Sequence, residues 1–260
     1  SIKEYIKMNI LNEILENKKQ EISTMNHFAL DNKNYPKYDL LKALSTKNLS
    51  FIAEIKLKSP SEGDIFPEAD IIQIARDYQN AGASAISVLT DKKFFGGSLE
   101  FLSKVKTNVS IPVIQKDFII DPFQVEIGMS HGADSFLLIA EAIPKGMIEN
   151  FKKLISSRGL TPLIEFHSQS KIDIIEDLAP QIVGVNSRDL ASMKTNIKHF
   201  EKVFEFLPLE SIKVAESGIR SIEDLKYIRQ LGYDAVLVGT SLMKSKSPGK
   251  ALEKMIEGFI

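Results

Sequence analysis

Residues 69–89 read ADIIQIARDYQNAGASAISVL, a helical pattern followed directly by a short apolar run. Within the first half, apolar side chains recur at helical spacing, at Ile71, Ile74, Ala75 and Tyr78. That spacing gives a helix one apolar stripe on an otherwise polar surface. The run SAISVL from Ser84 is rich in apolar residues, as in a parallel strand covered by helices. The stretch therefore predicts a helix that packs on a parallel sheet.

The same alternation recurs along the chain, with helical segments between short apolar runs. Eight runs predict strands: FIAEI from Phe51, SAISVL from Ser84, IPVI from Ile111, DSFLLIA from Asp134, TPLIEF from Thr161, QIVGVN from Gln181, IKVAE from Ile212 and DAVLV from Asp234. Eight strand-and-helix units are typical of an α/β fold of the (β/α)₈ TIM-barrel class. A doubly wound open sheet is the alternative that this pattern leaves open.

Residues 1–50 precede the first predicted strand and form an N-terminal extension. An apolar stripe predicts an amphipathic helix there, formed by Ile6, Ile10, Leu11, Ile14 and Leu15. Such a helix can close one end of a barrel or help to cover an active site, and the sequence leaves both open. Because no Gly/Ser/Pro-rich linker interrupts the chain, we predict a single (β/α)₈-barrel domain over residues 1–260, of which 1–50 is a helical extension.

The composition excludes several classes of function. Lysine and arginine number 33 against 34 acidic residues, and this net charge of -1 gives no reason to expect a nucleic-acid or membrane partner. The chain has no cysteine, which excludes disulfides and thiolate chemistry. The histidines lack metal-ligand spacing, so we expect surface or loop residues and no metal site at His27, His131, His167 and His199. No signal peptide is evident, and no apolar stretch approaches the roughly 20 residues that cross a bilayer, so we expect a cytoplasmic protein.

Polar residues gather at the predicted strand ends, where the active sites of such barrels lie. They are Glu54, Lys56, Lys116, Glu165, Asn186, Arg188, Glu216 and Ser217. Glu54 and Lys56 are two residues apart, so both point to one side of a strand, toward the barrel axis. Because burying unpaired charges is costly, these groups either form a structural ion pair or face a polar cavity. Their convergence with Lys116 and Glu165 on one mouth favours the cavity.

Glycine motifs follow the last two predicted strands. ESGI at 216–219 and VGTS at 238–241 place Ser217, Gly218, Gly239 and Thr240 in those loops. Backbone N–H groups and hydroxyls at helix N-termini can hold a phosphate dianion. Since the loops after the seventh and eighth strands are the frequent phosphate site of this fold, we predict a phosphorylated small-molecule substrate.

Over essentially its whole length, the chain resembles the indole-3-glycerol phosphate synthase family. The segments that carry the resemblance are IAEIKLKSPSEG at 52–63, FFGGS at 94–98, QKDFIIDPFQ at 115–124, LIEFH at 163–167, VGVNSRDL at 183–190, AESGI at 215–219 and LVGTSLM at 237–243. Two positions depart from the family pattern. Gln115 stands where the family usually has arginine, and Ser187 replaces the second asparagine of N-N-R-D. Neither is a proposed proton carrier.

The resemblance implies a carboxy-lyase of tryptophan biosynthesis that needs no cofactor. It would convert 1-(2-carboxyphenylamino)-1-deoxyribulose 5-phosphate to indole-3-glycerol phosphate by ring closure, decarboxylation and dehydration. Lys116 is then the leading general acid, and we expect desolvation and neighbouring cations to lower its pKa. Lys56 would hold the departing carboxylate and donate a proton during dehydration. Glu54 and Glu165 share the acid and base roles of dehydration, and the sequence does not divide them.

The remaining site residues are assigned to binding or support. Asn186 and Ser217 join the catalytic set, Asn186 as a hydrogen-bonding partner of the substrate. Arg188 suits either a substrate carboxylate or the orientation of Glu54 or Glu165. Ser59 approaches the phosphate or closes the loop above it. An apolar slot for the anthranilate ring is formed by Phe95, Phe118, Leu137 and Leu237, for which core packing is the alternative.

Two other functions compete with this one. Another phosphate-binding barrel enzyme, such as phosphoribosylanthranilate isomerase, moves a proton and does not need two lysines with two glutamates. A catalytically silent metabolite-binding barrel would keep the glycine loops but lack part of the charged set. We expect a monomer, with an association with another tryptophan-pathway enzyme left open, and no nucleic-acid or membrane partner.

Overall fold

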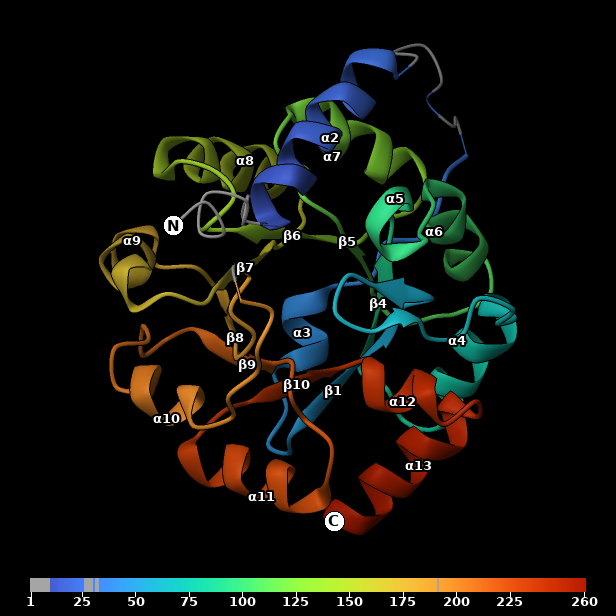
Figure 1. Cartoon of the computed structure of the whole chain (residues 1–260), viewed down its shortest axis with the longest axis vertical. Helices are drawn as coiled ribbons and strands as arrows, with labels where there is room; N and C mark the ends of the chain where they lie inside the picture. The colour runs from blue at the N-terminus through green and yellow to red at the C-terminus, as the bar shows by residue number, and fades with distance from the viewer. Residues whose placement is uncertain (1–9, 26–29, 31–32, 191) are drawn as a thin grey trace, which may run out of the picture.

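The computed structural model describes residues 10–25, 30, 33–190 and 192–260, and their central feature is a closed parallel barrel (Figure 1). Each of the eight predicted runs forms one barrel strand: β1 (Ser50–Ile55), β4 (Ala85–Leu89), β5 (Val113–Lys116), β6 (Ser135–Ile139), β7 (Leu163–Phe166), β8 (Ile182–Asn186), β9 (Ile212–Glu216) and β10 (Ala235–Val238). Strand β1 pairs in parallel with both β4 and β10. This closure confirms the TIM barrel and excludes the open sheet.

Helices surround the barrel and connect its strands. The outer helices are α4 (Ile71–Asn80), α6 (Leu99–Lys106), α7 (Pro122–Ser130), α8 (Lys145–Ser157), α9 (Ile172–Leu178), α10 (His199–Phe204), α11 (Ile222–Leu231) and α13 (Pro248–Phe259). In α4 the predicted apolar stripe is the buried face, and Asp70 begins the helix by accepting hydrogen bonds from Ile72 N and Gln73 N. Of the helices in the described ranges, none combines the length and apolar character that a membrane span needs.

Shorter elements lie in the loops at the carboxyl ends of the strands. They are the hairpin β2 (Lys58–Ser59) and β3 (Gly63–Asp64) after β1, α5 (Lys92–Phe95) after β4, η1 (Gln169–Lys171) after β7 and α12 (Thr240–Lys244) after β10. Loops at this end carry the active sites of such barrels. These elements therefore surround the position where the sequence predicts the site.

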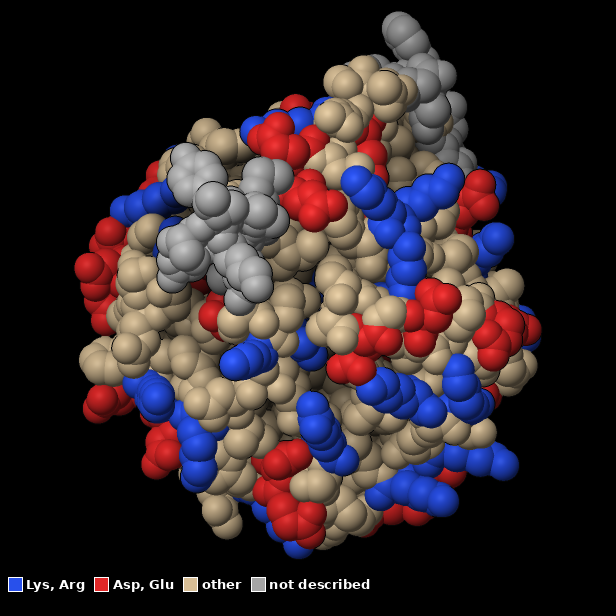
Figure 2. Space-filling model, in the orientation of Figure 1, with Lys and Arg blue, Asp and Glu red and all other residues tan. Residues whose placement is uncertain are grey.

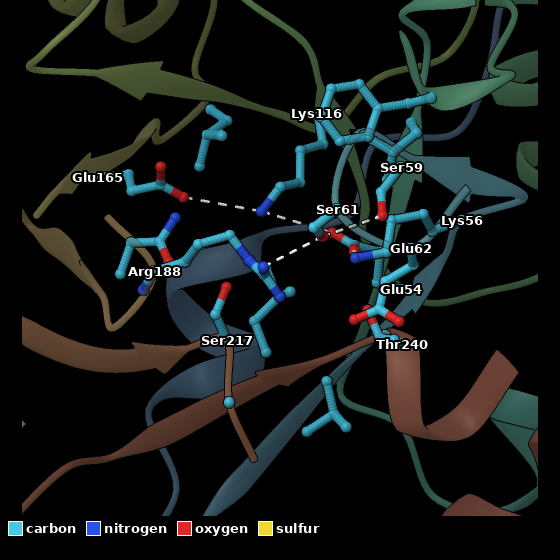
Figure 3. A pocket seen from close by; sticks show the side chains of 18 of the residues that line it. Glu54, Lys56, Ser59, Ser61, Glu62, Lys116, Glu165, Arg188, Ser217 and Thr240 are labelled. Carbon is cyan, nitrogen blue, oxygen red and sulfur yellow. Dashed lines mark hydrogen bonds and ion pairs between the residues drawn. The ribbon is translucent and has the colours of Figure 1, made fainter. Parts of the chain in front are cut away.

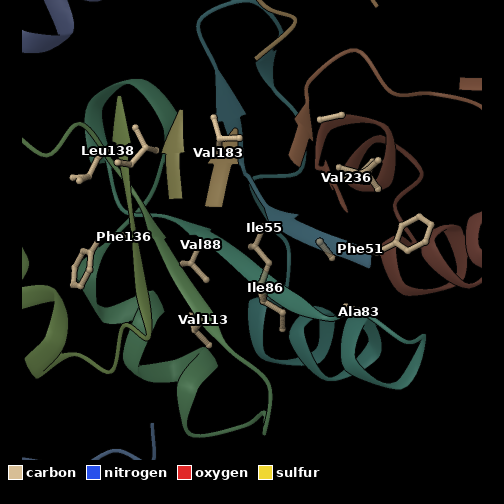
Figure 4. Close-up of a cluster of buried hydrophobic side chains, with 14 of the residues drawn as sticks. Phe51, Ile55, Ala83, Ile86, Val88, Val113, Phe136, Leu138, Val183 and Val236 are labelled. Atoms are coloured by element: carbon tan, nitrogen blue, oxygen red, sulfur yellow. The ribbon is translucent and has the colours of Figure 1, made fainter. Parts of the chain in front are cut away.

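Alternate strand residues divide between two clusters of buried apolar side chains. Outward residues such as Phe51, Ile86 and Phe136 pack between the sheet and the helices (Figure 4). Inward residues such as Ile52 and Ile114 form the interior cluster of the barrel. Because side chains alternate along a strand, the inward residues share their side with the polar groups at the strand ends.

The N-terminal extension contributes to both ends of the barrel through α2 (Ile10–Thr24) and α3 (Leu40–Leu44). Leu40 and Leu44 join the interior cluster with Ala85 and Ala235 at the amino ends of the strands, so α3 closes the base. Leu11 and Ile14 of α2 join the same cluster with Phe118 and Ile139 at the carboxyl ends. The two interpretations of the extension therefore apply to different helices. The predicted apolar stripe is helical from Ile10 to Leu15, and Ile6 and His27 lie outside the described residues.

A buried ion pair fastens the extension to the barrel base. Asp134 is 2 % exposed and accepts hydrogen bonds from Lys106 Nζ, Val113 N and Tyr38 N. The Lys106 ammonium also lies 4.0 Å from the centroid of the Tyr38 ring. One carboxylate thus links the segment before α3 to α6 and β5.

Replacing Asp134 with alanine is expected to lower the free energy of unfolding by about 3–5 kcal/mol, because it leaves the buried Lys106 ammonium without its partner. The matched control is Asp177→Ala, which removes an exposed carboxylate that pairs with Lys145 at 2.8 Å. Exposed pairs contribute little, so this control should leave the urea midpoint almost unchanged. Equal midpoint shifts in the two variants would contradict the assignment of Asp134 as a structural anchor.

Candidate active site

One cavity at the carboxyl ends of the strands is lined by every residue that the sequence assigned to catalysis, substrate binding or phosphate binding (Figure 3). Side chains of both charge signs are mixed over the face of the molecule in Figure 2. No broad field of one sign dominates that face, so an anionic ligand has to be recognised by local groups. Those groups fall into a charged centre, a glycine-lined loop pair and an apolar slot.

The charged centre is built around Lys116 at the end of β5. Its Nζ lies 3.4 Å from Glu54 Oε2, 3.6 Å from Glu165 Oε2 and 3.3 Å from Glu216 Oε2. The second oxygen of Glu54 lies 3.3 Å from Lys56 Nζ. The three carboxylates are at most 2 % exposed. The predicted convergence of two lysines with Glu54 and Glu165 is therefore present, from three different strands.

The expected direction of the Lys116 pKa was wrong. Burial alone would lower the pKa of this lysine, but the three surrounding carboxylates outweigh burial and raise it above its usual value. We expected desolvation and neighbouring cations to lower the pKa, but the strand ends bring three carboxylates to the ammonium. Lys116 is consequently held as an ammonium ion.

The carboxylates of the centre are not equivalent. Burial alone would raise the pKa of Glu54, but the ammonium groups of Lys116 and Lys56 outweigh burial and lower it. Burial and the charge of Glu165 raise the pKa of Glu216 well above its usual range, against the opposing effect of Lys116. Burial also lowers the pKa of Lys56, although Glu54 opposes this. Carboxyl groups whose pKa values are driven apart in one site are suited to different roles.

Glu216 belongs to this centre, and the sequence placed it at a strand end without giving it a role. It ends β9 and is fully buried. The sequence signal for a role was its position at a strand end, as the first residue of the ESGI motif. The cavity is lined in addition by Asp91, Asp117 and Arg220, which the sequence analysis did not assign to the site.

The two glycine motifs meet at the cavity as predicted. Ser217 and Gly218 follow β9 with φ values of 69° and 75°, a left-handed pair that turns the loop sharply. The Ser187 hydroxyl donates a hydrogen bond of 2.8 Å to the carbonyl oxygen of Ser217, so this family departure supports the loop. A Cβ at Gly239 would lie 2.6 Å from Glu54 Oε1, which explains why glycine is needed there. Thr240 begins α12 beside it. We call Ser217, Gly218, Gly239 and Thr240 the cradle.

The apolar slot is formed by Phe95 at the end of α5, Phe118 after β5, Leu137 on β6 and Leu237 on β10. The ring centroids of Phe95 and Phe118 are 6.2 Å apart. Phe118, Leu137 and Leu237 also belong to the interior cluster. These three residues therefore line the slot and also pack in the barrel interior.

The hairpin β2–β3 borders the cavity and is held by Arg188. The Arg188 Nη1 donates hydrogen bonds to Ser61 Oγ at 3.1 Å and to the carbonyl oxygen of Met193 at 2.8 Å. Asn186 Oδ1 accepts a hydrogen bond from Arg188 N at 2.9 Å. Ser59 lies in β2 and is 6 % exposed. The hydrogen bonds of the Arg188 guanidinium thus hold the hairpin in place, and its charge also interacts with that of Glu54.

Comparison with known sequences agrees with these features. The family model described as indole-3-glycerol phosphate synthase matches residues 6–255. The indole-3-glycerol phosphate synthase of Geobacillus sp. (strain WCH70) is 40% identical over 249 residues, which are 95% of this chain and 96% of that protein. The protein of the same name from Leptospira interrogans is 40% identical over 242 residues, 93% of this chain and 95% of its own.

Comparison with solved structures supports the fold alone. 3-Hexulose-6-phosphate synthase from Salmonella typhimurium superposes with a TM-score of 0.64 at 13% identity and covers 82% of this chain and 100% of its own. 3-Keto-L-gulonate-6-phosphate decarboxylase from Vibrio cholerae gives a TM-score of 0.61 at 16% identity, with 83% and 100% covered. The family follows from the sequence matches, which extend over nearly the whole chain. This chain therefore belongs to the indole-3-glycerol phosphate synthase family, the carboxy-lyases of tryptophan biosynthesis.

Proposed function

We propose that the cavity closes the ring of 1-(2-carboxyphenylamino)-1-deoxyribulose 5-phosphate and forms indole-3-glycerol phosphate, carbon dioxide and water. One observation carries the proposal. The Lys116 ammonium lies within 3.6 Å of three buried carboxylates, in a cavity that also contains the cradle and the slot. Acid, base, phosphate and aromatic-ring sites are thus within the reach of one substrate.

Lys116 is the general acid of the first step. The ring carbon that bears the carboxylate attacks the sugar carbonyl carbon, and the carbonyl oxygen must take up a proton as it gains charge. The carboxylates around Lys116 raise its pKa, so the proton is present at neutral pH. A substrate oxygen that enters this cluster replaces part of the carboxylate contact and receives the proton.

Decarboxylation follows because the attack leaves the substrate nitrogen as an iminium. The electrons of the breaking carbon–carbon bond neutralise this iminium, so the substrate is its own electron sink. Lys56 holds the departing carboxylate. Because burial lowers the pKa of Lys56, this ammonium also gives up a proton more readily than an exposed lysine.

We assign Glu54 and Glu165 different roles in dehydration, a division that the sequence left open. Glu54 contacts both ammonium groups at 3.3 and 3.4 Å, and we assign it the role of anchoring them. Glu165 contacts only Lys116 of the two, at 3.6 Å, and is the base that removes the substrate proton. Lys56 gives its proton to the hydroxyl group that leaves as water. Asn186 and Ser217 hydrogen-bond the substrate's polar groups beside these residues.

Substrate binding is divided among the cradle, the slot and the hairpin. The phosphate lies in the cradle, and the anthranilate ring lies in the slot beside Phe95 and Phe118. Ser59 and Arg188 close the cavity from the side of the hairpin, where Arg188 already contacts Ser61. The cytoplasmic location, the single domain and the monomeric state stay predictions.

Gly218→Ala is expected to raise KM and the inhibition constant of inorganic phosphate. A Cβ there would lie 2.9 Å from Ser187 Oγ and crowd the cradle. Loss of one hydrogen bond to a charged group weakens binding by about 1.5–3 kcal/mol, or about tenfold or more in affinity. Gly159→Ala is the matched control, since Gly159 has a similar φ of +74° but nothing within 4 Å of the added atom. Similar phosphate inhibition in both variants would remove Gly218 from the cradle.

Turnover of the unmodified protein tests the proposed function. Mixing the chain with the anthranilate-linked substrate should produce indole fluorescence together with equimolar carbon dioxide. An isomerase would leave this compound unchanged and consume phosphoribosylanthranilate instead. A silent barrel would bind the compound, as measured by calorimetry, without converting it. Either of these results would overturn the proposal.

A further inference from the structure

A lysine outside the reacting groups is buried beside the cavity. Lys18 on α2 is 2 % exposed, and its Nζ lies 2.9 Å from Asp91 Oδ2, 2.9 Å from Asp117 Oδ1 and 2.7 Å from Glu21 Oε2. Asp91 and Asp117 line the cavity. Removing such charges from water costs as much as their attraction returns, and well-packed apolar residues would often be as stable. A role in setting geometry therefore explains this cluster better than stability alone.

Each of the two aspartates accepts a hydrogen bond from the backbone segment that carries one ring of the slot. Asp91 begins α5 by accepting a hydrogen bond of 2.8 Å from Phe94 N, and Phe95 ends that helix. Asp117 accepts a hydrogen bond of 2.7 Å from Phe118 N through the same oxygen that contacts Lys18. The two aspartates are thus attached to the backbone segments that carry Phe95 and Phe118.

A second contact reinforces the loop after β5. The other oxygen of Asp117 accepts a hydrogen bond of 2.6 Å from Thr90 Oγ1, which in turn accepts one of 3.1 Å from Gln115 Nε2. Thr90 directly precedes Asp91, so these hydrogen bonds form a second connection, besides Lys18, between the same two loops. Gln115, a departure from the family pattern, takes part in this link.

We propose that Lys18 is a positioning residue, which ties the loop after β4 to the loop after β5 and so fixes the spacing of Phe95 and Phe118. The inference rests on the proposed function, which assigns this slot to the aromatic ring of the substrate. Lys18 reaches no reacting atom itself, and its effect passes through Asp91 and Asp117. The N-terminal helix is thereby part of the substrate-binding apparatus.

The residues that hold the slot are different from those that hold the general acid. Lys116 is held by its own carboxylates on β1, β7 and β9, none of which contacts Lys18. Without Lys18, the two buried aspartates that shared its ammonium repel one another, and the loops that carry the rings move apart. The slot loosens, while the general acid keeps its partners. The expected effect is therefore on KM more than on kcat.

The test compares Lys18→Met with Lys19→Met. Methionine keeps the length of the side chain without its charge, and Lys19 is an exposed neighbour on the same helix that pairs with Glu16. Because a displacement of about 1 Å can cost up to about 100-fold, Lys18→Met should raise KM about 10- to 100-fold, with kcat within about threefold of the unmodified protein. Inorganic phosphate should inhibit both variants equally, since it probes the cradle and not the slot. Lys19→Met should keep the original KM.

An unchanged KM in folded Lys18→Met would overturn the inference. So would a loss of kcat and of phosphate inhibition as large as the rise in KM. If Lys18→Met does not fold, Asp91→Asn is measured instead. The amide keeps the oxygen that begins α5 but removes the charge that Lys18 binds, so KM should rise by about tenfold, and a normal KM would again overturn the inference. Failure of the proposed function is a separate result, because the unmodified protein would then not convert the substrate at all.

Discussion

Replacing Lys116 with methionine is expected to lower kcat for ring closure by about 10² to 10⁴, the range associated with loss of a general acid. Methionine fills the space of the lysine stem but cannot protonate the sugar carbonyl. Because this protonation precedes the departure of carbon dioxide, the release of carbon dioxide and the appearance of indole fluorescence should fall together. Stopped-flow measurement of both signals tests the order of steps as well as the size of the loss.

The matched control is Lys153→Met, which removes an exposed lysine of α8 away from the cavity. It should turn over normally. Near-normal kcat in Lys116→Met would remove Lys116 from its role. A loss of the same size in both variants would show that the assay reports general damage.

The same substitution has a pH-dependent effect on stability. In the unmodified protein the ammonium groups of Lys116 and Lys56 hold the pKa of Glu54 below its usual value against burial, so Glu54 stabilises the fold above its unfolded pKa. This contribution disappears as the pH falls through the lowered folded pKa. In Lys116→Met the buried carboxyl groups lose their partner, and protonation in acid relieves them. The difference in melting temperature between the two proteins should therefore be largest at neutral pH and shrink below about pH 4.

Glu165→Gln is the second substitution with a large expected effect. The amide has the shape of the carboxylate but cannot take up the substrate proton, so formation of the indole should slow by about 10² to 10⁴. Since Glu165 is assigned to dehydration, carbon dioxide should still be released in a single turnover before the indole appears. This separation of the two signals distinguishes Glu165 from Lys116.

Glu176→Gln is its control, because this exposed residue lies on α9, which follows the same strand. It should leave both signals unchanged. If Glu165→Gln delayed carbon dioxide as much as indole, Glu165 would act in the first step. Normal indole formation in this variant would assign the base to another carboxylate, and Glu54 is the next candidate.

The barrel and most of its site could be predicted because both depend on local pattern. Short apolar runs with helices between them define the strands, and a general rule of the fold brings all strand ends to one mouth. Lys116 and Glu165 could thus be placed together although no local feature links them. The cradle could be predicted for the same reason, from glycines that follow the last two strands.

What the sequence did not reveal depends on distances across the barrel. The pKa of Lys116 is raised by carboxylates on three other strands, and their number and closeness follow from register and tilt. The hydrogen bond from Arg188 to Ser61 could not be predicted, because Ser61 lies in a hairpin whose path the sequence does not fix. No local feature of the sequence distinguishes Lys18 from its exposed neighbour Lys19. Only the docking of α2 against the β4 and β5 loops makes Lys18 a buried partner of Asp91 and Asp117.

A structure of the chain with an unreactive substrate analogue, in which the sugar carbonyl is reduced to an alcohol, tests the central claim most directly. The phosphate should accept hydrogen bonds from backbone N–H groups of Gly218 and Gly239, with the aromatic ring against Phe95 and Phe118. The alcohol oxygen should lie within hydrogen-bond distance of Lys116 Nζ. A phosphate bound outside the cradle, or an alcohol oxygen out of reach of Lys116, would contradict the account.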